Sequence, residues 1–321
     1  MLIVTEQTCQ EVIDRNHAFE AVEKVFAAMA RGDAYNFPVI REAIGHADAL
    51  YGFKSGFDRA GLVLGVKSGG YWPGNQEKGL TNHQSTVFLF DPDTGRLTAL
   101  VGGNYLTAVR TAASSAVSIA HLACRESKIL GMVGAGHQAR FQLRAAAEKR
   151  DFEKVVAWNR HPEMLPKLEQ VANEIGLPFE AVEREELCAR ADVIITIASA
   201  SEPLLERDWI RPGTHIACMG TDTKGKQEVS ADLVATATLF TDEIAQSVSI
   251  GETQHAIAMG SISEADITAI GEVINGTHPG RSSEDEITLF DGTGVGLQDL
   301  AVASVAAKLA EAQGKAQVVE L

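Results

Sequence analysis

The chain has 321 residues, a length typical of about two domains, and 45% of them are hydrophobic, which suffices for sizeable cores. There are 28 lysines and arginines against 43 acidic residues, and the formal net charge of −15 disfavours nucleic acids and anionic membranes as partners, since both attract clustered cations. An acidic surface can still enclose a basic pocket, so this charge is compatible with an anionic small-molecule substrate.

The cysteines and the amino terminus indicate a cytoplasmic protein. Cys9, Cys124, Cys188 and Cys218 are isolated and form no CxxC pair, which favours reduced structural thiols, and we expect no metal. The opening segment Met-Leu-Ile-Val-Thr-Glu lacks a basic region followed by a long apolar core, so we expect no signal peptide. No apolar run approaches the length that spans a membrane.

The first block, from Met1 to about Arg125, mixes helical and extended patterns. Helices are predicted near Asn16–Arg31 and, from small residues, at Thr107–Leu122. Extended segments are predicted around Leu50–Phe53, Gly61–Ser68 and Ser85–Phe90, with Asp91–Gly95 as a turn between strands.

From about Lys128 to about Gly296, apolar strands alternate with helices such as Gln138–Lys149 and Pro162–Ile175. The predicted strands are Lys128–Val133, Lys154–Trp158, Phe179–Val182, Asp192–Ile197, Thr214–Met219, Thr238–Thr241 and Ile287–Phe290. Continuous Val- and Ile-rich strands between helices imply a parallel sheet covered on both faces.

The end of the chain, Gly296–Ala312, has the composition of a strong helix of Ala, Leu and Val. A terminal helix must bury its apolar face, and packing against the first block would do so. We therefore expect residues 126–296 to form one domain, and residues 1–125 together with 297–321 to form a substrate-binding and dimerisation domain.

A glycine-rich turn between a predicted strand and a predicted helix is the most informative segment. In Gly134-x-Gly136-x-x-Ala139, Gly134 would make the tight turn, Gly136 would let the backbone approach a pyrophosphate, and Ala139 would permit close helix–strand packing. The helix N-terminus would offer N–H groups to the phosphates. An ordinary βα turn is the alternative, but the flanking strand and helix favour a dinucleotide. The predicted fold class is α/β, a doubly wound parallel-sheet (Rossmann) domain plus an α+β domain.

Three cations end apolar segments of the first block: Arg41, Lys67 and Arg110. Arg110 lies on an otherwise apolar helix, where a charge is costly unless it is paired, and a substrate carboxylate is a natural partner for an arginine. An exposed or internally paired cation is the alternative for each of them.

Two loops of the second block suit the nicotinamide end of a cofactor. Asp222 follows the strand at Thr214–Met219, and ligands lie at the carboxyl ends of strands in doubly wound sheets. Asp222 can therefore exchange protons with a substrate nitrogen or activate water, and a turn or capping role is its alternative. The glycine-rich segment Leu289–Gly296 suits the back of a cofactor ring, or is a turn.

These segments resemble, in the same order, those of the ornithine cyclodeaminase/μ-crystallin family. The matching segments are Pro38–Arg41, Gly65–Lys67, Phe90–Gly95, Tyr105–Ala113, Gly134–Ala139, Gly220–Glu228 and Gly294–Asp299. The resemblance spans nearly the whole chain and implies a homodimer whose interface comes from the first domain through sheet pairing. It also implies that Arg41, Lys67 and Arg110 hold the substrate's α-carboxylate, and that Asp222 and Lys67 are catalytic, with Asp222 as the acid/base.

Within this family, the segments Gly69–Asn75 and Thr81–Ser85 resemble members that reduce iminosuccinate to L-aspartate. We therefore expect NADH-dependent reduction of a small α-imino acid to the L-amino acid. A second carboxylate would need further donors, of which His83 is the first candidate, since an imidazolium can pair with a carboxylate and a neutral imidazole can donate one hydrogen bond. A hydrogen-bonded histidine inside the sheet is the alternative.

Other functions stay open from the sequence: an ornithine cyclodeaminase, an alanine dehydrogenase or, outside enzymes, a crystallin-like binding protein. The joint presence of the three cations and Asp222 argues against the last, since a binding protein needs no proton donor.

The expected cofactor is a nicotinamide dinucleotide. The residues expected to bind it are Thr111, Gly134, Ala135, Gly136, His137, Gln138, Ala139, Asn159, Arg160, Ala198, Met219, Gly220, Thr293 and Gly294. Many family members carry Asp or Glu at the end of the second strand, where this chain reads Trp158-Asn159-Arg160. Without that acid, repulsion of a 2′-phosphate is weakened and Arg160 can welcome one, whereas Asn159 can bond a ribose hydroxyl. These residues leave NAD and NADP open, and the resemblance to iminosuccinate-reducing members favours NAD.

Overall fold

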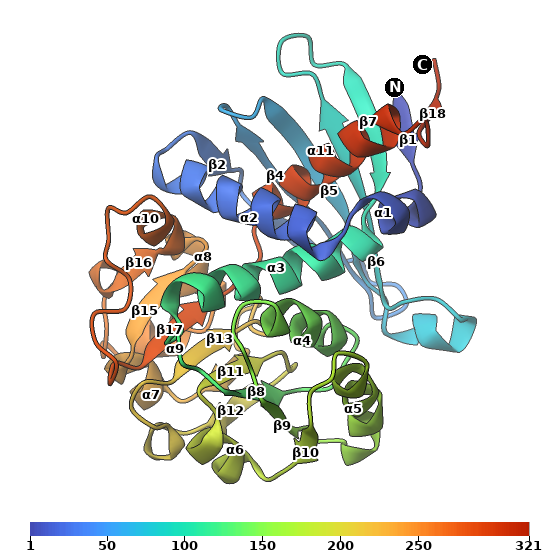
Figure 1. The fold of residues 1–321 in the computed structure, drawn as a ribbon. Helices are drawn as coiled ribbons and strands as arrows, with labels where there is room; N and C mark the ends of the chain where they lie inside the picture. Colours follow the sequence, from blue (N-terminus) through green and yellow to red (C-terminus); the bar gives the residue numbers. More distant parts are fainter. Residues whose placement is uncertain (321) are drawn as a thin grey trace. The chain divides into compact units, whose positions relative to one another are not determined.

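The computed structural model describes residues 1–320, which form two compact units (Figure 1). Unit 1 comprises Met1–Arg110 and the chain from Val295 on, and unit 2 comprises Thr111–Gly294. Within the described range, no helix combines the length and the hydropathy that a membrane crossing requires.

Unit 2 is built on a parallel sheet of eight strands in the order β10-β9-β8-β11-β13-β17-β15-β16. The chain enters at β8, winds outward through β9 and β10, and continues on the other side of β8 at β11, so the strand order reverses between β8 and β11. The strands are β8 (Ile129–Val133), β9 (Lys154–Trp158), β10 (Phe179–Ala181), β11 (Val193–Thr196), β13 (His215–Cys218), β15 (Thr238–Thr241), β16 (Ile267–Ala269) and β17 (Thr288–Asp291). A separate pair joins β12 (Ser201–Leu205) to β14 (Gln227–Val229).

Helices cover both faces of this sheet, so β11, β13 and β17 are buried along their whole length (Figure 1). The helices are α4 (Ala139–Ala147), α5 (Leu165–Glu174), α6 (Arg184–Arg190), α7 (Ala231–Thr236), α8 (Ile244–Ile250), α9 (Gln254–Ala258) and α10 (Ile270–Ile274). Short 3-10 turns lie at Pro162–Met164, Arg207–Trp209 and Glu264–Asp266.

Unit 1 contains a second eight-stranded sheet, in the order β18-β1-β7-β6-β5-β4-β2 with β3 paired to β4. Its strands are β1 (Leu2–Val4), β2 (Ala34–Asn36), β3 (Ile40–Ala43), β4 (Leu50–Asp58), β5 (Val63–Tyr71), β6 (His83–Phe90), β7 (Leu97–Gly102) and β18 (Gln317–Val318). All pairs are antiparallel except β1 with β7. A 3-10 turn, η1 (Pro73–Lys78), connects β5 to β6.

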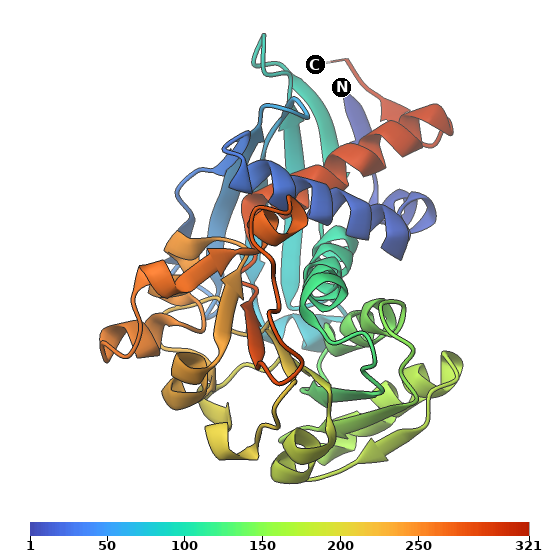
Figure 2. The same ribbon diagram turned by 60° about the vertical axis from the view of Figure 1, so that its left-hand side comes forward.

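One face of this sheet is covered by α2 (Arg15–Ala30) and α11 (Gly296–Ala312), which lie side by side (Figures 1 and 2). Glycines in the strands let α11 approach closely: a Cβ at Gly56 would lie 3.1 Å from Leu297, and a Cβ at Gly65 would lie 2.9 Å from Leu300. A short helix, α1 (Glu6–Val12), precedes α2.

The predicted fold class is confirmed, and the predicted strands and helices lie within a few residues of the observed ones. Several short strands were not predicted, among them β1, β2 and β3, because three or four residues are too few to show a periodic pattern. The two units divide after Arg110 and Gly294, rather than near 125 and 296. The reason lies in α3 (Asn104–Leu122), whose later residues bond within unit 2, Ser118 Oγ to His215 Nε2 at 3.1 Å.

Candidate active site

The turn after β8 has the geometry of a dinucleotide-binding loop. Gly134 has φ +112°, a conformation that favours glycine, and a Cβ there would lie 2.7 Å from the Ile197 carbonyl oxygen. At Gly136, by contrast, no atom lies within 4 Å of the Cβ position, so the backbone is open to a ligand. Ala139, fully buried, begins α4 against the sheet.

A buried oxygen in this loop fits a nucleotide. Gln138 Oε1 is buried and has no hydrogen-bond partner among residues 1–320. Buried polar atoms are nearly always bonded, so this acceptor suits a donor from outside the chain, such as a ribose hydroxyl or an amide. The residues present therefore fit a dinucleotide. Burial and Arg140 lower the pKa of the adjacent His137, which is neutral at pH 7.

The end of β9 is tied to the glycine loop. Asn159 Oδ1 accepts a hydrogen bond from Ala135 N (3.1 Å), and its Nδ2 donates to the His161 carbonyl oxygen (2.8 Å). The Asn159 side chain thus fixes the conformation of the glycine loop, a role that was not predicted. Its hydrogen bond to a ribose hydroxyl stays a prediction. Arg160 is exposed beside it.

Glu228, on β14, joins the ends of β11 and β13. Its carboxylate accepts hydrogen bonds from Thr196 Oγ1 (2.7 Å), Ala198 N (2.6 Å) and Gly220 N (2.8 Å). Burial and the neighbouring Glu252 carboxylate raise the pKa of Glu228. Ala198 and Gly220 can therefore contribute shape to a cofactor site, but their N–H groups are already bonded within the protein.

Asp242, directly after β15, holds the loop that follows β17 in a similar way. Its carboxylate accepts bonds from Thr293 N (3.0 Å), Thr293 Oγ1 (2.6 Å) and Gly294 N (2.8 Å). Met219 lies under the same loop: a Cβ at Gly292 would lie 2.6 Å from its sulfur. These buried carboxylates were missed from the sequence because their loop partners are distant along the chain.

The predicted acid/base, Asp222, lies half-buried in the loop after β13. Lys226 Nζ lies 2.8 Å from its Oδ1 and 3.3 Å from the Gly220 carbonyl oxygen. The lysine therefore anchors the Asp222 loop, and the catalytic role of Asp222 stays a prediction. The part of the chain that the structure describes contains no group of three or more His, Cys, Asp or Glu residues able to hold a metal.

Two of the predicted substrate cations meet in unit 1 around a carboxylate that was not predicted. Lys67 Nζ, on β5, lies 2.7 Å from Asp299 Oδ2, and Arg110 Nε, on α3, lies 3.0 Å from Asp299 Oδ1. The side chains of all three are at least 92% buried, with 7%, 8% and 1% exposed for Lys67, Arg110 and Asp299. Gln298 Oε1 accepts a further bond from Arg110 Nη1 at 3.0 Å.

Burial and charge set the protonation of this cluster. Burial, partly offset by Asp299, lowers the pKa of Lys67 to about 7. The cations of Arg110 and Lys67 outweigh burial at Asp299 and lower its pKa to about 2. Asp299 is therefore ionised at neutral pH, whereas Lys67 can exchange a proton there. Asp299 could have been predicted from the sequence because, like Arg110, it is a charged residue among the apolar residues of a helix.

The face of the sheet around Lys67 is set by strand register. Gly52 and Gly69 are paired neighbours one row beyond Lys67, and we call them the glycine strip. Arg41 and Ser85 flank the strip in the same row, on β3 and β6. Arg41 is exposed and stays outside the buried cluster, so its part in holding a carboxylate stays a prediction.

His83 stands one row further along the same face, paired with Tyr71. Burial, with the charge of Lys67 as the next cause, lowers the pKa of His83 to about 3. The imidazole is therefore neutral at pH 7, and of the two forms considered from the sequence only the neutral hydrogen-bond donor is present.

Comparison with known proteins places these features in a family. The chain matches the model of the ornithine cyclodeaminase/mu-crystallin family over residues 2–313. It is 62% identical to the iminosuccinate reductase of Paracoccus denitrificans over 321 residues, 100% of both chains. The crystal structure of that reductase in complex with NAD+ superposes with a TM-score of 0.97, covering 100% of this chain and 99% of the other.

Two more distant structures share the whole fold. An archaeal alanine dehydrogenase dimer with bound NAD is 31% identical, with a TM-score of 0.93 and coverage of 100% and 99%. The Delta(1)-pyrroline-2-carboxylate reductase of Thermococcus litoralis, in complex with NADH and L-proline, is 29% identical, with a TM-score of 0.93 and coverage of 99% and 100%.

A doubly wound nucleotide-binding unit, together with a buried cluster of cations, defines a dinucleotide-dependent oxidoreductase that acts on an anionic substrate. The chain belongs to the ornithine cyclodeaminase/mu-crystallin family, and the resemblance seen in its sequence is thereby confirmed.

Proposed function

We propose that this protein is an NAD-dependent reductase that converts iminosuccinate to L-aspartate. The buried Lys67–Asp299–Arg110 cluster carries the proposal, because it presents cations to a carboxylate substrate and includes a group that titrates near neutrality. The whole-length identity of 62% to an iminosuccinate reductase supports the choice of substrate.

Arg110 and Lys67 hold the α-carboxylate. Arg110 donates from Nε to Asp299 Oδ1 and from Nη1 to Gln298 Oε1, which fixes the plane of its guanidinium group. Asp299 fixes both cations before substrate arrives, so little side-chain entropy is lost on binding. Once bound, the α-carboxylate of the substrate favours the charged form of Lys67.

The reduction adds a hydride to the imine carbon and a proton to the nitrogen, so one imine, one hydride and one proton give one amine. The bound dinucleotide supplies the hydride. Lys67, with a pKa of about 7, can give a proton to the imine nitrogen, which makes the carbon more electrophilic. Asp222 is the second candidate for proton exchange, and Lys226 would keep it oriented.

Residues of unit 2 would hold the cofactor. The loop at Gly134–Gln138 and the N-terminus of α4 suit the pyrophosphate, whereas Gln138 Oε1 suits a ribose hydroxyl or an amide of the cofactor. The loops ending at Ala198, Gly220 and Gly294 suit the nicotinamide end. NAD is the proposed cofactor, as in the relative solved with NAD+.

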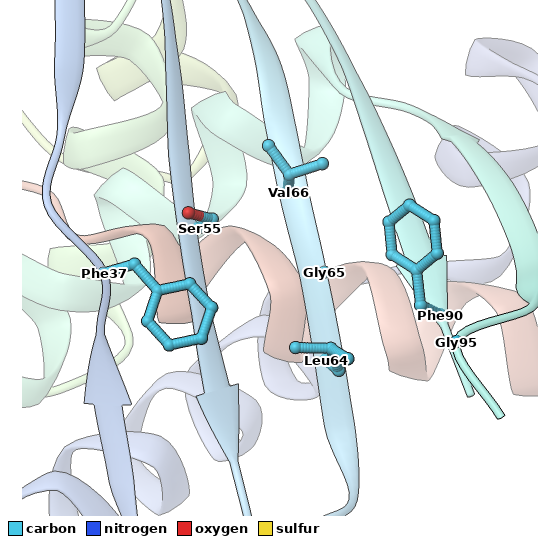
Figure 3. A pocket seen from close by; sticks show the side chains of 7 residues that line it. All are labelled: Phe37, Ser55, Leu64, Gly65, Val66, Phe90 and Gly95. Atoms are coloured by element: carbon cyan, nitrogen blue, oxygen red, sulfur yellow. The ribbon is translucent and has the colours of Figure 1, made fainter. Parts of the chain in front are cut away.

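We also propose a homodimer, because the sheet of unit 1 has one apolar face that α11 does not cover. Figure 3 shows Phe37, Leu64, Val66 and Phe90 on the side of the sheet away from α11. These residues line a hollow of about 330 Å³. On the same side, Ile40 and Phe53 are 52% and 39% exposed. A second copy is the fitting occupant, since an alanine dehydrogenase with the same fold is a dimer.

A cytoplasmic location is part of the proposal. The four cysteines are free, and three of them are buried, as expected of a protein in a reducing compartment.

The test of the proposed function supplies the imine in place, since imines hydrolyse readily. Oxaloacetate or pyruvate is mixed with ammonia and NADH, and the loss of NADH absorbance is followed together with amino-acid products. We expect aspartate, with oxaloacetate far faster than pyruvate. Equal rates, or ornithine turnover without net NADH loss, would contradict the proposal.

A further inference from the structure

Lys54 lies directly opposite Lys67 in the sheet of unit 1. The two are register partners on β4 and β5, and directly paired residues project from the same face. This is the face covered by α11, because the Cβ position of Gly56, two residues along β4, meets Leu297. Lys54 was not among the candidate residues predicted from the sequence.

The glycine strip lies immediately beside this pair of lysines. Gly52 and Gly69 follow Lys54 and Lys67 by one row and carry no side chains. The next row holds Tyr71, with His83 beside it. A small molecule lying on the strip would thus be bordered by lysines on one side and by hydrogen-bonding groups on the other.

Lys54 and Lys67 bring two positively charged side chains to one face of the sheet, and Lys67 is buried. An anion bound beside both lysines would be attracted by two positive charges, and this attraction is stronger where water is excluded.

The charge of Lys54 reaches the other groups of the cluster. It contributes to the lowered pKa values of Lys67, His83 and Asp299, although burial or a nearer charge is the larger cause at each. Asp299, meanwhile, has one oxygen against Lys67 and the other against Arg110. Lys54 therefore adds a positive charge next to a set of three residues that already contact one another.

We propose that Lys54 binds the distal carboxylate of the substrate and sets the preference for a dicarboxylic imine over a monocarboxylic one. This inference rests on the proposed function, in which Arg110 and Lys67 hold the α-carboxylate. Opposed residues in an antiparallel pair have Cβ atoms about 4.5–5.5 Å apart, so the two long lysine side chains start close together and can reach the two carboxylates of one small molecule. His83 and Tyr71 would add neutral hydrogen bonds.

The test compares two substrates in matched variants of the full chain. Lys54→Met removes the charge and keeps much of the side-chain length, Lys54→Arg keeps the charge, and Lys24→Met, at an exposed position of α2, is the control. We measure kcat/KM for oxaloacetate and for pyruvate, each with ammonia and NADH. Lys54→Met should lower the oxaloacetate value about 10- to 100-fold, the effect of losing a hydrogen bond between charged groups, and change the pyruvate value less than about threefold.

Each alternative outcome has a distinct meaning. Equal losses for both substrates, or no loss for either, would overturn the inference. A wild type that does not prefer oxaloacetate would instead overturn the proposed function, whatever the variants do. If Lys54→Met does not fold, Lys54→Arg is compared with wild type for thermal stabilisation by succinate and by propionate. The inference expects Lys54→Arg to keep the excess stabilisation by succinate, and a wild type without that excess would refute it.

Discussion

Replacing Asp299 with asparagine should destabilise unit 1 in a pH-dependent way. The amide keeps the shape of the side chain but removes the charge that lies 2.7 Å from Lys67 and 3.0 Å from Arg110. Removing one partner of a buried ion pair leaves an uncompensated charge, at a cost of about 3–5 kcal/mol. The upper part of this range applies only while both cations remain charged.

The sign of the pH dependence follows from the two pKa values. The Asp299 pKa lies at about 2, below its ordinary value, so its ionised form stabilises the native state throughout the neutral range. The Lys67 pKa lies at about 7, below its ordinary value, so Lys67 carries its charge in the native state mainly below that pH. The Lys67–Asp299 attraction is therefore present at pH 6 and mostly lost by pH 9. The destabilisation by Asp299→Asn should be larger at pH 6 than at pH 9.

The measurement is urea unfolding at both pH values, with hydrogen exchange of peptides from β5 and α11 to localise the effect. Asp93→Asn, an exposed aspartate in the turn after β6, is the control and should change stability by less than about 0.5 kcal/mol. Succinate should restore less stability to Asp299→Asn than it adds to wild type if Asp299 is needed to position the cations. Equal destabilisation at pH 6 and pH 9 would refute the assigned coupling between Lys67 and Asp299.

Four further predictions concern the cofactor and the chemistry. Gly136→Val should abolish NADH binding in fluorescence titrations while thermal stability is kept, because no protein atom lies within 4 Å of the added Cβ. Asn159→Asp should weaken NADPH binding far more than NADH binding, since the new charge repels a 2′-phosphate. Asp222→Asn should lower kcat in steady-state assays but leave NADH affinity unchanged, since it removes only a proton-exchanging group. Succinate affinity should fall as pH rises above about 7, where Lys67 loses its proton, and Lys67→Arg should abolish this dependence.

For each of these four predictions, one result would contradict the reasoning. A Gly136→Val protein that melts early would mean that the turn, and not the nucleotide, was disturbed. Equal responses of both cofactors to Asn159→Asp would place the ribose elsewhere. An unchanged kcat in Asp222→Asn would remove this residue from the mechanism, and an unchanged pH dependence in Lys67→Arg would assign the titration to another group.

Much of the fold was accessible from the sequence because its signals are local. The run at Lys154–Trp158 was predicted with its observed limits, since its three central residues are apolar, as expected of a strand covered on both faces. The glycine loop could equally be predicted from the sequence, because its turn needs a positive φ at Gly134, which residues other than glycine rarely adopt. The short strand β3 could not be predicted, since it is extended because it pairs with β4.

The candidate site was accessible only in part. Lys67 and Arg110 were found because a charge on an apolar segment needs a partner. The sequence by itself predicted that Lys67 and Arg110 would need a partner and that a dinucleotide loop would follow β8, since both depend on the order of residues along a few turns of chain. The tertiary structure alone decided that the partner is Asp299, 189 residues beyond Arg110, and that Lys54 lies opposite Lys67. Such partners meet only when α11 packs on the sheet and the strands take their register, which are contacts between segments that the local sequence does not encode.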